Sequence, residues 1–459
     1  MSFPVTPTSA FVTRRRSLGD RFKSPALFVA GAPPPRNYPA NTYDFRPNSH
    51  YLYFGGPREP GAALLLRSGK TTLFAEPPNR DDALWHGPRP SLEEQGRAWA
   101  ADEVRPLAEL ADEICPIRGE IAALAPQDAA SVLGLSSLLG RTVGPDSSAR
   151  DAELAEVVIG LRLIHDEAAV AQLQAAAAIS SDAHVAGMRA ARGAKSEEEI
   201  CAAITHELYR NGMDDAYPPI VSVRGEVLHN HHHDGALSPG DLILCDVGGE
   251  SPEGWASDIT RTWPVNGQFS PTQRAIYEIV LQAQLTAIDK VRPGVRYRDV
   301  HDAAKRVIVT ELVSLGILRG SVDGLLERGA AALFFPHGVG HLIGLDVHDM
   351  EDMGDRAGYA PRRERSPRFG DKYLRLDRDL APGMAVTIEP GFYQVPEIMN
   401  DPELTAPLGA DLARDVLERY RDVRGIRIED DVLCTALEPV VLSARCPKNA
   451  RDVETAIGG

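Results

Sequence analysis

Five side chains of the kinds that commonly bind metal ions interrupt apolar segments in the second half of the chain. They are four carboxylates and one imidazole, namely Asp246, Asp258, His341, Glu389 and Glu429. A single acid or histidine in an apolar segment is usually a satisfied structural residue, but here several separate segments share the pattern. Buried carboxylates that repel one another are costly unless cations lie between them. The residue types therefore indicate a metal site.

Four negative charges would balance two divalent cations, so a two-metal site would be nearly neutral. Ligation dominated by oxygen favours Mn²⁺ first, with Co²⁺ or Zn²⁺ as alternatives, over a thiolate zinc site. Two ions about 3.5–4 Å apart can share a bridging hydroxide as nucleophile while they polarise a carbonyl group. The chemistry that this residue set indicates is hydrolysis.

Two predicted strands carry the first two acids. Residues 242–249 and 257–263 are apolar runs separated by turn residues, so they can pair as a hairpin. This pairing would bring Asp246 and Asp258 side by side. Alternatively, each acid faces solvent or forms an ion pair with Arg261, which is the commoner use of such acids.

The other candidate ligands lie in later segments. His337 and His341 are four residues apart after an apolar run, and His348 follows soon after them. Glu389 and Glu429 each interrupt a predicted strand. The strands must bring these segments together for the metal site to form.

Length and composition limit the class of protein. The chain has 459 residues and a formal net charge of −16, with 43% hydrophobic and 25% charged residues. These values are typical of a globular protein, and the length favours two domains. Nucleic acid is not an expected partner, because phosphate backbones require clustered Lys and Arg. No apolar run approaches the roughly 18–20 residues that cross a membrane.

Cysteine usage and the N-terminus both indicate a cytoplasmic protein. The five cysteines are widely spaced and include no Cys-x-x-Cys pair, so we expect no disulfide framework. Three arginines at 14–16 resemble part of an export signal, but charged residues follow where such a signal needs an apolar run. We interpret them as part of a basic surface helix.

The order of predicted elements is mixed. Strands are predicted at 26–30, 51–54, 62–66 and 71–74, with a hairpin turn at 67–70. Helices are predicted at 98–113, 153–179 and 182–192, and Ser196 is the expected N-cap of another. A domain boundary is expected near 150–160, at the turn-rich stretch 144–148. Residues 355–379 are rich in Pro, Arg and Asp and are interpreted as an exposed insertion.

The combined motifs resemble those of the pita-bread metallopeptidases, and within them the proline-specific branch of aminopeptidase P and prolidase. The matching stretches are Asp-Ile-Thr-Arg-Thr at 258–262, Pro-His-Gly-Val-Gly-His at 336–341, Ile-Glu-Pro-Gly at 388–391 and Gly-Ile-Arg-Ile-Glu-Asp-Asp at 425–431. Residues 10–130 look like the N-terminal domain of that branch, with the matching stretches 43–49, 51–54 and 83–87. The resemblance implies an α/β (α+β) fold, with an N-terminal aminopeptidase P-type domain at 1–155 and a pita-bread catalytic domain at 156–459.

The resemblance also implies a role for each metal ligand. Asp258 and Glu429 would bridge both ions, Asp246 would complete the shell of one ion, and His341 with Glu389 that of the other. Glu389 would in addition handle the proton of the bridging hydroxide. Side chains that would line the substrate site or help to hold the tetrahedral intermediate are His229, His337, His348, Tyr393 and Arg427.

Two features have no counterpart in the family pattern. Asp246 and Asp258 are twelve residues apart, where the family usually has eleven. We interpret the extra residue as part of a longer hairpin turn, because an insertion within a strand would turn one acid away from the site. The histidines at 231–233 are interpreted as an exposed loop cluster, with a metal tract as the alternative.

The substrate could be either of two kinds. Aminopeptidase P removes the first residue of peptides that begin Xaa-Pro, whereas prolidase cleaves only Xaa-Pro dipeptides and needs a cation for the nearby carboxylate. Arg375 resembles the carboxylate-binding arginine of prolidases, although it could instead pair with Asp371, Asp377 or Asp379. We favour aminopeptidase P, because residues 258–267 and the N-terminal domain look more like that enzyme.

The sequence is also compatible with functions that need no metal. The same fold hosts metal-free hydrolases and inactive interaction proteins, so the fold alone does not prove metal catalysis. Relatives form dimers or tetramers, and we expect a homo-oligomer with Trp85 as a candidate contact. The expected partners are proline-containing peptides, with neither a nucleic acid nor a membrane.

Overall fold

The computed structural model describes residues 3–144 and 147–458, and their contacts divide the chain into two units. One unit is Val5–Ala168, and the other contains the described residues from Ala169 onward together with Phe3 and Pro4. The domain boundary at 155/156 stays a prediction. Pro145 and Asp146 of the expected linker lie outside the described residues.

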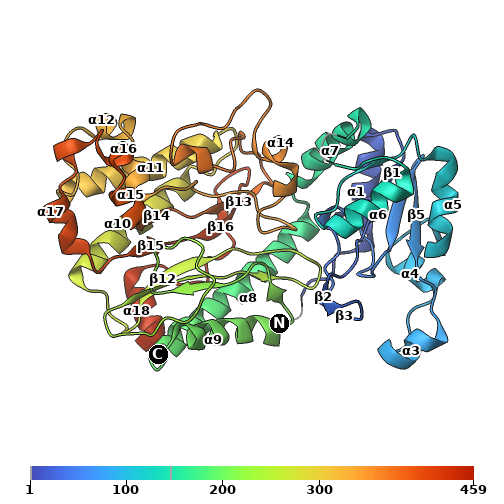
Figure 1. Cartoon of the computed structure of the whole chain (residues 1–459), viewed down its shortest axis with the longest axis horizontal. Helices are drawn as coiled ribbons and strands as arrows, with labels where there is room; N and C mark the ends of the chain where they lie inside the picture. The colour runs from blue at the N-terminus through green and yellow to red at the C-terminus, as the bar shows by residue number, and fades with distance from the viewer. Residues whose placement is uncertain (1–2, 145–146, 459) are drawn as a thin grey trace. The chain divides into compact units, whose positions relative to one another are not determined.

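The N-terminal unit contains a five-stranded mixed sheet in the order β6-β5-β4-β1-β7 (Figure 1). Its strands, together with a separate β2–β3 pair, are β1 Ala26–Val29, β2 Pro35–Tyr38, β3 Asn41–Thr42, β4 Ala63–Arg67, β5 Lys70–Ala75, β6 Glu103–Pro106 and β7 Ala122–Ala123. Its helices are α1 Thr8–Arg21, α2 Ser49–Tyr53, α3 Arg80–His86, α4 Leu92–Ala98, α5 Leu110–Ile114, α6 Ala129–Leu139 and α7 Ala149–Arg162.

The predicted hairpin between β4 and β5 is confirmed. Arg67 pairs with Lys70, and Ser68 and Gly69 between them have φ values of 52° and 76°. Two positive φ angles are typical of a two-residue turn whose twist matches that of the strands.

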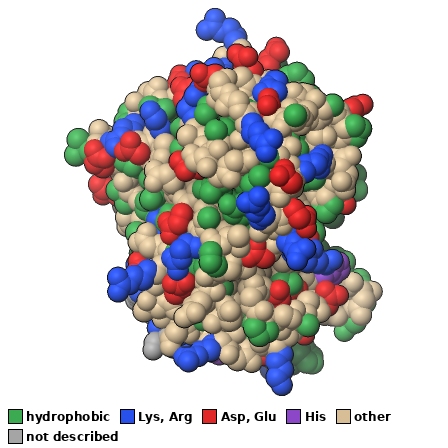
Figure 2. All heavy atoms as spheres, turned by 90° about the vertical axis from the view of Figure 1, so that its left-hand side faces the viewer, with side chains coloured by type: hydrophobic (Ala, Val, Ile, Leu, Met, Phe, Trp, Pro, Cys, Tyr) green, Lys and Arg blue, Asp and Glu red, His purple; other side chains and the backbone are tan. Residues whose placement is uncertain are grey.

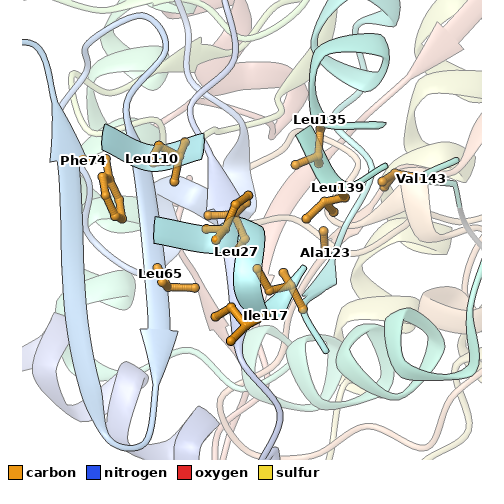
Figure 3. Close-up of a cluster of buried hydrophobic side chains, with 12 residues drawn as sticks. Leu27, Leu65, Phe74, Leu110, Ile117, Ala123, Leu135, Leu139 and Val143 are labelled. Carbon is orange, nitrogen blue, oxygen red and sulfur yellow. The ribbon is translucent and has the colours of Figure 1, made fainter. Parts of the chain in front are cut away.

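Apolar side chains from the sheet and from α5 and α6 form the core of this unit (Figure 3). Leu27, Leu65 and Phe74 on the strands belong to the same buried cluster as Leu110 on α5 and Leu135 on α6. Burial of a side chain of this size contributes about 1.5–3 kcal/mol. The contacts within this core hold the sheet, α5 and α6 together.

Three predictions for the N-terminal unit are wrong. Residues 51–53 belong to helix α2 and Phe54 is its C-cap, because the Asn48 side chain accepts a hydrogen bond from the His50 amide at 2.9 Å and caps a helix there. Residues 98–113 are not one helix, since β6 pairs with β5 inside this range. The arginines at 14–16 lie on a helix, α1, as predicted, but only Arg16 is exposed. Arg14 and Arg15 are buried, and Arg15 donates to the Phe54 carbonyl oxygen at 2.6 Å.

The second unit contains short antiparallel strands among long helices (Figure 1). The strands are β8 Asp214–Asp215, β9 Ile220–Ser222, β10 Leu242–Asp246, β11 Gly249–Glu250, β12 Thr260–Pro264, β13 Ala385–Ile388, β14 Gly391–Tyr393, β15 Gly425–Arg427, β16 Asp430–Leu433 and β17 Val440–Val441. The helices are α8 Glu167–Ala191, α9 Glu197–Arg210, α10 Pro271–Asp289, α11 Tyr297–Ser314, α12 Val322–Glu327, α13 Ala330–Phe334, α14 Asp355–Gly358, α15 Pro396–Met399, α16 Pro402–Thr405, α17 Arg414–Leu417 and α18 Ala450–Gly458.

The helix predictions are partly correct for this unit. Ser196 caps α9 as expected, and its hydroxyl accepts from the Glu199 amide at 3.4 Å. Helix α8 is continuous from Glu167 to Ala191, so the predicted break near 180 is wrong, and the chain instead leaves α7 after Arg162.

The hairpin formed by β10 and β12 has one unbroken register. Asp246 pairs with Thr260, and beyond them the Ser257 amide donates to the Gly249 carbonyl oxygen at 3.0 Å. The extra residue therefore lies in the turn, as predicted, where Gly254 has a φ of 92°. In this register Asp258 lies opposite Gly248, two positions from Asp246, so both acids are on one face of the sheet.

The pairing of β13 with β16 and of β14 with β15 also follows one continuous register. Ile388 pairs with Asp430, and Gly391 pairs with Arg427. Glu389 therefore lies opposite Glu429, between the paired strand segments. Like charges directly opposite each other on a ladder are destabilising, so these positions require an opposite charge nearby.

Residues 355–379 are not a wholly exposed insertion. Leu374, Leu376 and Asp377 within them are buried. Arg296 forms two hydrogen bonds of 2.6 Å to the Asp377 carboxylate. The segment is therefore attached to the residue that precedes α11, its N-cap Arg296, because a buried carboxylate needs such a partner.

Three general observations agree with the composition. All five cysteines are free. Acidic and basic side chains are intermixed on the face in Figure 2. In the part of the chain that the structure describes, every helix is too short or too polar to cross a bilayer.

Candidate metal centre

A cavity of about 410 Å³ in the second unit brings the predicted site residues together. All of them line it except Tyr393, which contacts the lining residues His337 and Arg427. Apolar and aromatic side chains complete the wall, namely Leu228, Phe369, Tyr373, Val395 and Ile398. The cavity therefore combines a charged end with an apolar surface, as small-ligand sites commonly do.

The two hairpin acids share one hydrogen-bond donor. The Tyr217 hydroxyl lies 2.7 Å from Asp246 Oδ1 and 2.6 Å from Asp258 Oδ1. Asp246 also accepts from Arg427 Nη2 at 2.5 Å. The alternative pairing with Arg261 is wrong, because Arg261 pairs with Asp430 instead.

The five candidate ligands form overlapping groups. Atoms of Asp246, Asp258 and Glu429 lie within 4.8 Å of one another, as do those of His341, Glu389 and Glu429. Glu429 belongs to both groups, so the two groups are adjacent. A third group of the same kind joins Asp258 and His341 to His348.

The protonation of His341 suits a metal ligand. Its Nδ1 lies 2.9 Å from the Leu342 carbonyl oxygen, which can only accept, so Nδ1 carries the proton. Its Nε2 therefore presents a lone pair, 3.4 Å from Asp258 Oδ2 and 3.8 Å from Glu389 Oε1. Burial lowers the pKa of His341 to about 4, which keeps the ring neutral. Three electron-pair donors that face one another fit a cation.

The pKa shifts of the carboxylates indicate a site that binds positive charge. Burial raises the pKa of Asp258, and the negative charge of Asp246 raises it further. Burial also raises the pKa of Glu429, to which the charges of Asp258 and Glu389 add. Divalent cations would reverse these shifts, because they stabilise the ionised form. The donor set therefore fits the two divalent ions that the sequence indicated.

A chain of hydrogen bonds connects Arg427 to His337. Arg427 Nη1 donates to the Tyr393 hydroxyl at 2.9 Å, and that hydroxyl lies 2.9 Å from His337 Nε2. His337 Nδ1 lies 2.8 Å from the Gly338 carbonyl oxygen and must donate to it, so Nε2 accepts from Tyr393. Burial lowers the pKa of His337 to about 3. The His337 ring is thus neutral and fixed in orientation, and its Nδ1 lies 3.6 Å from Glu389 Oε2.

A second polar group lies at the opening of the cavity. His348 Nδ1 lies 2.5 Å from Glu351 Oε2, and Glu351 also forms an ion pair with Arg375. The suggested pairing of Arg375 with an acid at 371, 377 or 379 is therefore wrong. Those acids have other partners, namely Lys305, Arg296 and Arg363.

The remaining histidines differ in position. His229 lines the cavity. Its neighbour His231 stacks on it with ring centroids 6.5 Å apart, and His233 bonds to the Pro219 carbonyl oxygen at 3.0 Å. Among the described residues, the candidate metal groups do not include the histidines at 231–233.

Sequence reasoning missed several residues that support this site. Tyr217 has no local pattern that marks it, since only the fold brings it to the two acids. Thr260 lies in the quoted motif and donates to Glu429 Oε2 at 2.6 Å. Asp431 accepts from the Asp258 amide at 3.1 Å. Their motif positions could have indicated a supporting role for Thr260 and Asp431.

Glu197 anchors the loop that carries His229, and its loss should destabilise the protein. Its buried carboxylate accepts from Ser222 Oγ, the Val223 amide and the Gly235 amide at 2.7–3.0 Å. Glu197→Ala leaves these donors without a partner, so we expect a loss of about 3 kcal/mol in the free energy of unfolding. Urea unfolding measures this loss.

Glu198→Ala is the matched control, because its exposed neighbouring position predicts a change below about 0.5 kcal/mol. Hydrogen exchange at residues 223–235 should accelerate in the Glu197 variant only. Equal stability of the two variants would contradict the anchoring role.

Comparison with known proteins agrees with this geometry. Residues 171–436 match metallopeptidase family M24, and residues 11–120 match the aminopeptidase P N-terminal domain. The chain is 31% identical to a human Xaa-Pro dipeptidase over 99% of this chain and 94% of that protein. It is 34% identical to an Xaa-Pro aminopeptidase of Haemophilus influenzae, over 90% of this chain and 88% of the relative.

Solved structures give the same result. Aminopeptidase P from E. coli with the inhibitor Pro-Leu superposes with a TM-score of 0.81 at 29% identity and covers 98% of both chains. Aminopeptidase PepP of Pseudomonas aeruginosa has a TM-score of 0.80 at 30% identity and covers 100% of this chain and 99% of its own. The expected fold class, an N-terminal domain followed by a pita-bread domain, is confirmed. The chain belongs to metallopeptidase family M24.

Proposed function

We propose that the chain is a dinuclear metallo-exopeptidase of the Xaa-Pro aminopeptidase type, which hydrolyses the bond before proline at peptide N-termini. The observation that carries this proposal is the convergence of Asp246, Asp258, His341, Glu389 and Glu429 on one cavity. The names of the relatives support the Xaa-Pro specificity. Mn²⁺ is the proposed metal, because the donor set is dominated by oxygen.

Bound divalent ions would supply Lewis acidity and an activated water as nucleophile. The chain itself then has to move a proton and to stabilise negative charge on the substrate. Glu389 is the proposed proton acceptor, since its carboxylate lies in the ligand cluster and faces the cavity. Asp258 and Glu429 are the proposed bridging ligands.

The hydrogen-bonded chain from Arg427 through Tyr393 fixes the ring of His337 at the wall of the cavity. A fixed polar group costs little reorganisation when charge develops on the substrate. His337, whose two ring nitrogens already bond to Tyr393 and to the Gly338 carbonyl oxygen, is therefore proposed to shape the substrate site as a fixed wall. His348 is proposed to contact the reacting carbonyl, and His229 to line the substrate site. The apolar wall suits the proline ring, which has no N–H to satisfy.

His348→Ala should lower kcat by about 10²-fold while the metal content stays unchanged, because a polar side chain proposed to contact the reacting carbonyl is lost. Steady-state kinetics on Ala-Pro-Ala, together with metal analysis, measures both quantities. His206→Ala, at a position on α9 that does not line the cavity, is the control. Unchanged kinetics in the His348 variant would leave this residue without a catalytic role.

The experiment that tests the proposed function compares Ala-Pro-Ala, Ala-Ala-Ala and Ala-Pro as substrates of the Mn²⁺-loaded protein. We expect release of alanine from Ala-Pro-Ala and none from Ala-Ala-Ala. Equal cleavage of both tripeptides would contradict the proline specificity.

Prolidase is the second candidate function. The observation that favours it is the position of Arg375, which lines the cavity where it could bind a dipeptide carboxylate. Cleavage of Ala-Pro alone would support this alternative. A metal-free role is disfavoured, because all five candidate ligands are present and grouped.

We further propose a homo-oligomer in the cytoplasm. Leu84 and Trp85 on α3 are each 78% exposed, which is unusual for side chains of this size. The free cysteines suit a reducing compartment. Light scattering on the wild type and on Trp85→Ala tests the assembly, and a monomer in both would contradict it.

A further inference from the structure

Two arginines line the cavity among the described residues, and they differ in their partners. Arg427 is buried, and it bonds to Asp246, Tyr393 and Thr260. Its guanidinium is therefore already hydrogen-bonded within the ligand cluster. Arg375 is 39% exposed and lies at the opening, so it is the guanidinium that a substrate carboxylate could approach.

Glu351 already occupies that guanidinium. Its Oε1 pairs with Arg375, while its Oε2 accepts from His348 Nδ1 at 2.5 Å. The carboxylate is thus held from two sides, by the two residues that would meet the product side of a substrate. Sequence reasoning assigned Glu351 no role.

A second carboxylate at Arg375 would meet the negative charge of Glu351. In an Xaa-Pro dipeptide the free carboxylate is on the proline itself, directly beside the scissile bond. In a longer peptide a neutral amide takes this place. The free carboxylate then lies at least one residue further from the scissile bond, and each residue adds up to about 3.5 Å. The repulsion therefore acts on dipeptides and much less on longer peptides.

We propose that Glu351 is a specificity-determining residue, which occupies Arg375 and so directs the enzyme away from dipeptides toward longer Xaa-Pro peptides. This inference rests on the proposed function and names its substrate class. It requires no change in the metal ligands, since Glu351 contacts Arg375 and His348 and belongs to none of the candidate ligand groups.

The test compares substrates that differ only in charge, Ala-Pro and Ala-Pro amide. The measured quantity is the ratio of kcat/KM for Ala-Pro to kcat/KM for the amide. Glu351→Gln keeps the shape and removes the charge, so it should raise this ratio about tenfold. Glu351→Ala should raise it at least as much, because Arg375 can then bind the carboxylate with both nitrogens.

Two further variants separate the cause. The double variant Glu351→Gln with Arg375→Ala should not show the raised ratio of kcat/KM for Ala-Pro to kcat/KM for the amide, since no guanidinium remains to bind the carboxylate. Glu438→Gln is the matched control, because Glu438 also pairs with an arginine, Arg292 at 2.6 Å, but lies outside the cavity. This variant should keep the wild-type ratio.

The outcomes are distinct for the two proposals. If the wild type cleaves no Xaa-Pro peptide, the proposed function fails. If it cleaves Ala-Pro-Ala but the ratio in Glu351→Gln stays within about twofold of wild type, only the role of Glu351 is overturned. A gain that persists without Arg375, or a wild type that prefers Ala-Pro over its amide, would also overturn that role.

Discussion

Asp258→Asn is expected to lower kcat on Ala-Pro-Ala by about 10³-fold or more, which corresponds to about 4 kcal/mol in the activation barrier. Asp258 belongs to two of the candidate ligand groups and is the proposed bridge between the ions. An asparagine keeps the shape of the side chain but has no charge, so it binds a divalent cation poorly. Metal analysis should find fewer than two ions per chain.

Asp323→Asn provides the control for this experiment. Asp323 is exposed on α12, pairs with Arg306 at 2.8 Å and does not line the cavity. Its loss should change neither metal content nor kcat. If Asp258→Asn retained both ions and most of its activity, the ligand assignment would be wrong.

Arg261→Met should cause the largest loss of stability. Arg261 and Asp430 are fully buried and lie 2.7 Å apart, and Arg261 also donates to the Glu429 carbonyl oxygen at 2.6 Å. Asp430 is buried, which by itself would raise its pKa, but Arg261 and Lys448 hold this pKa well below its usual range. Removal of the arginine leaves the buried Asp430 carboxylate with Lys448 as its cationic partner and with the neutral donors Gln284 and Ser443, so we expect a loss of about 3–5 kcal/mol in the free energy of unfolding.

Urea unfolding followed by tryptophan fluorescence measures this change, since Trp255 and Trp263 are buried near the hairpin. Arg306→Met, which removes an exposed member of an ion pair, should change the free energy by less than about 0.5 kcal/mol. A loss below about 1 kcal/mol in Arg261→Met would show that the buried pair does not support the hairpin.

The hairpin and the grouping of the five candidate ligands illustrate what the sequence can predict. Asp246 and Asp258 lie on apolar strands whose period of two decides which face they share. One acid in each apolar segment is a local pattern, so it is visible without a structure. The opposite positions of Glu389 and Glu429 follow from a pairing of distant strands, and no local pattern predicts that pairing.

The errors have a common physical cause. Helix α2 depends on a cap at Asn48, which competes with the apolar character of the residues that follow it. The segment 355–379 has a polar composition, yet its attachment to Arg296 buries part of it. The contacts of Tyr217, and the pairing of Glu351 with Arg375, join residues far apart in the chain, so sequence spacing alone does not reveal them.

The measurement that tests the account most directly is alanine release from Ala-Pro-Ala as Mn²⁺ is added back to chelator-treated protein. The account predicts no release without metal, and activity that rises until two ions are bound per chain. Full activity after chelation, or two bound ions without cleavage before proline, would contradict it.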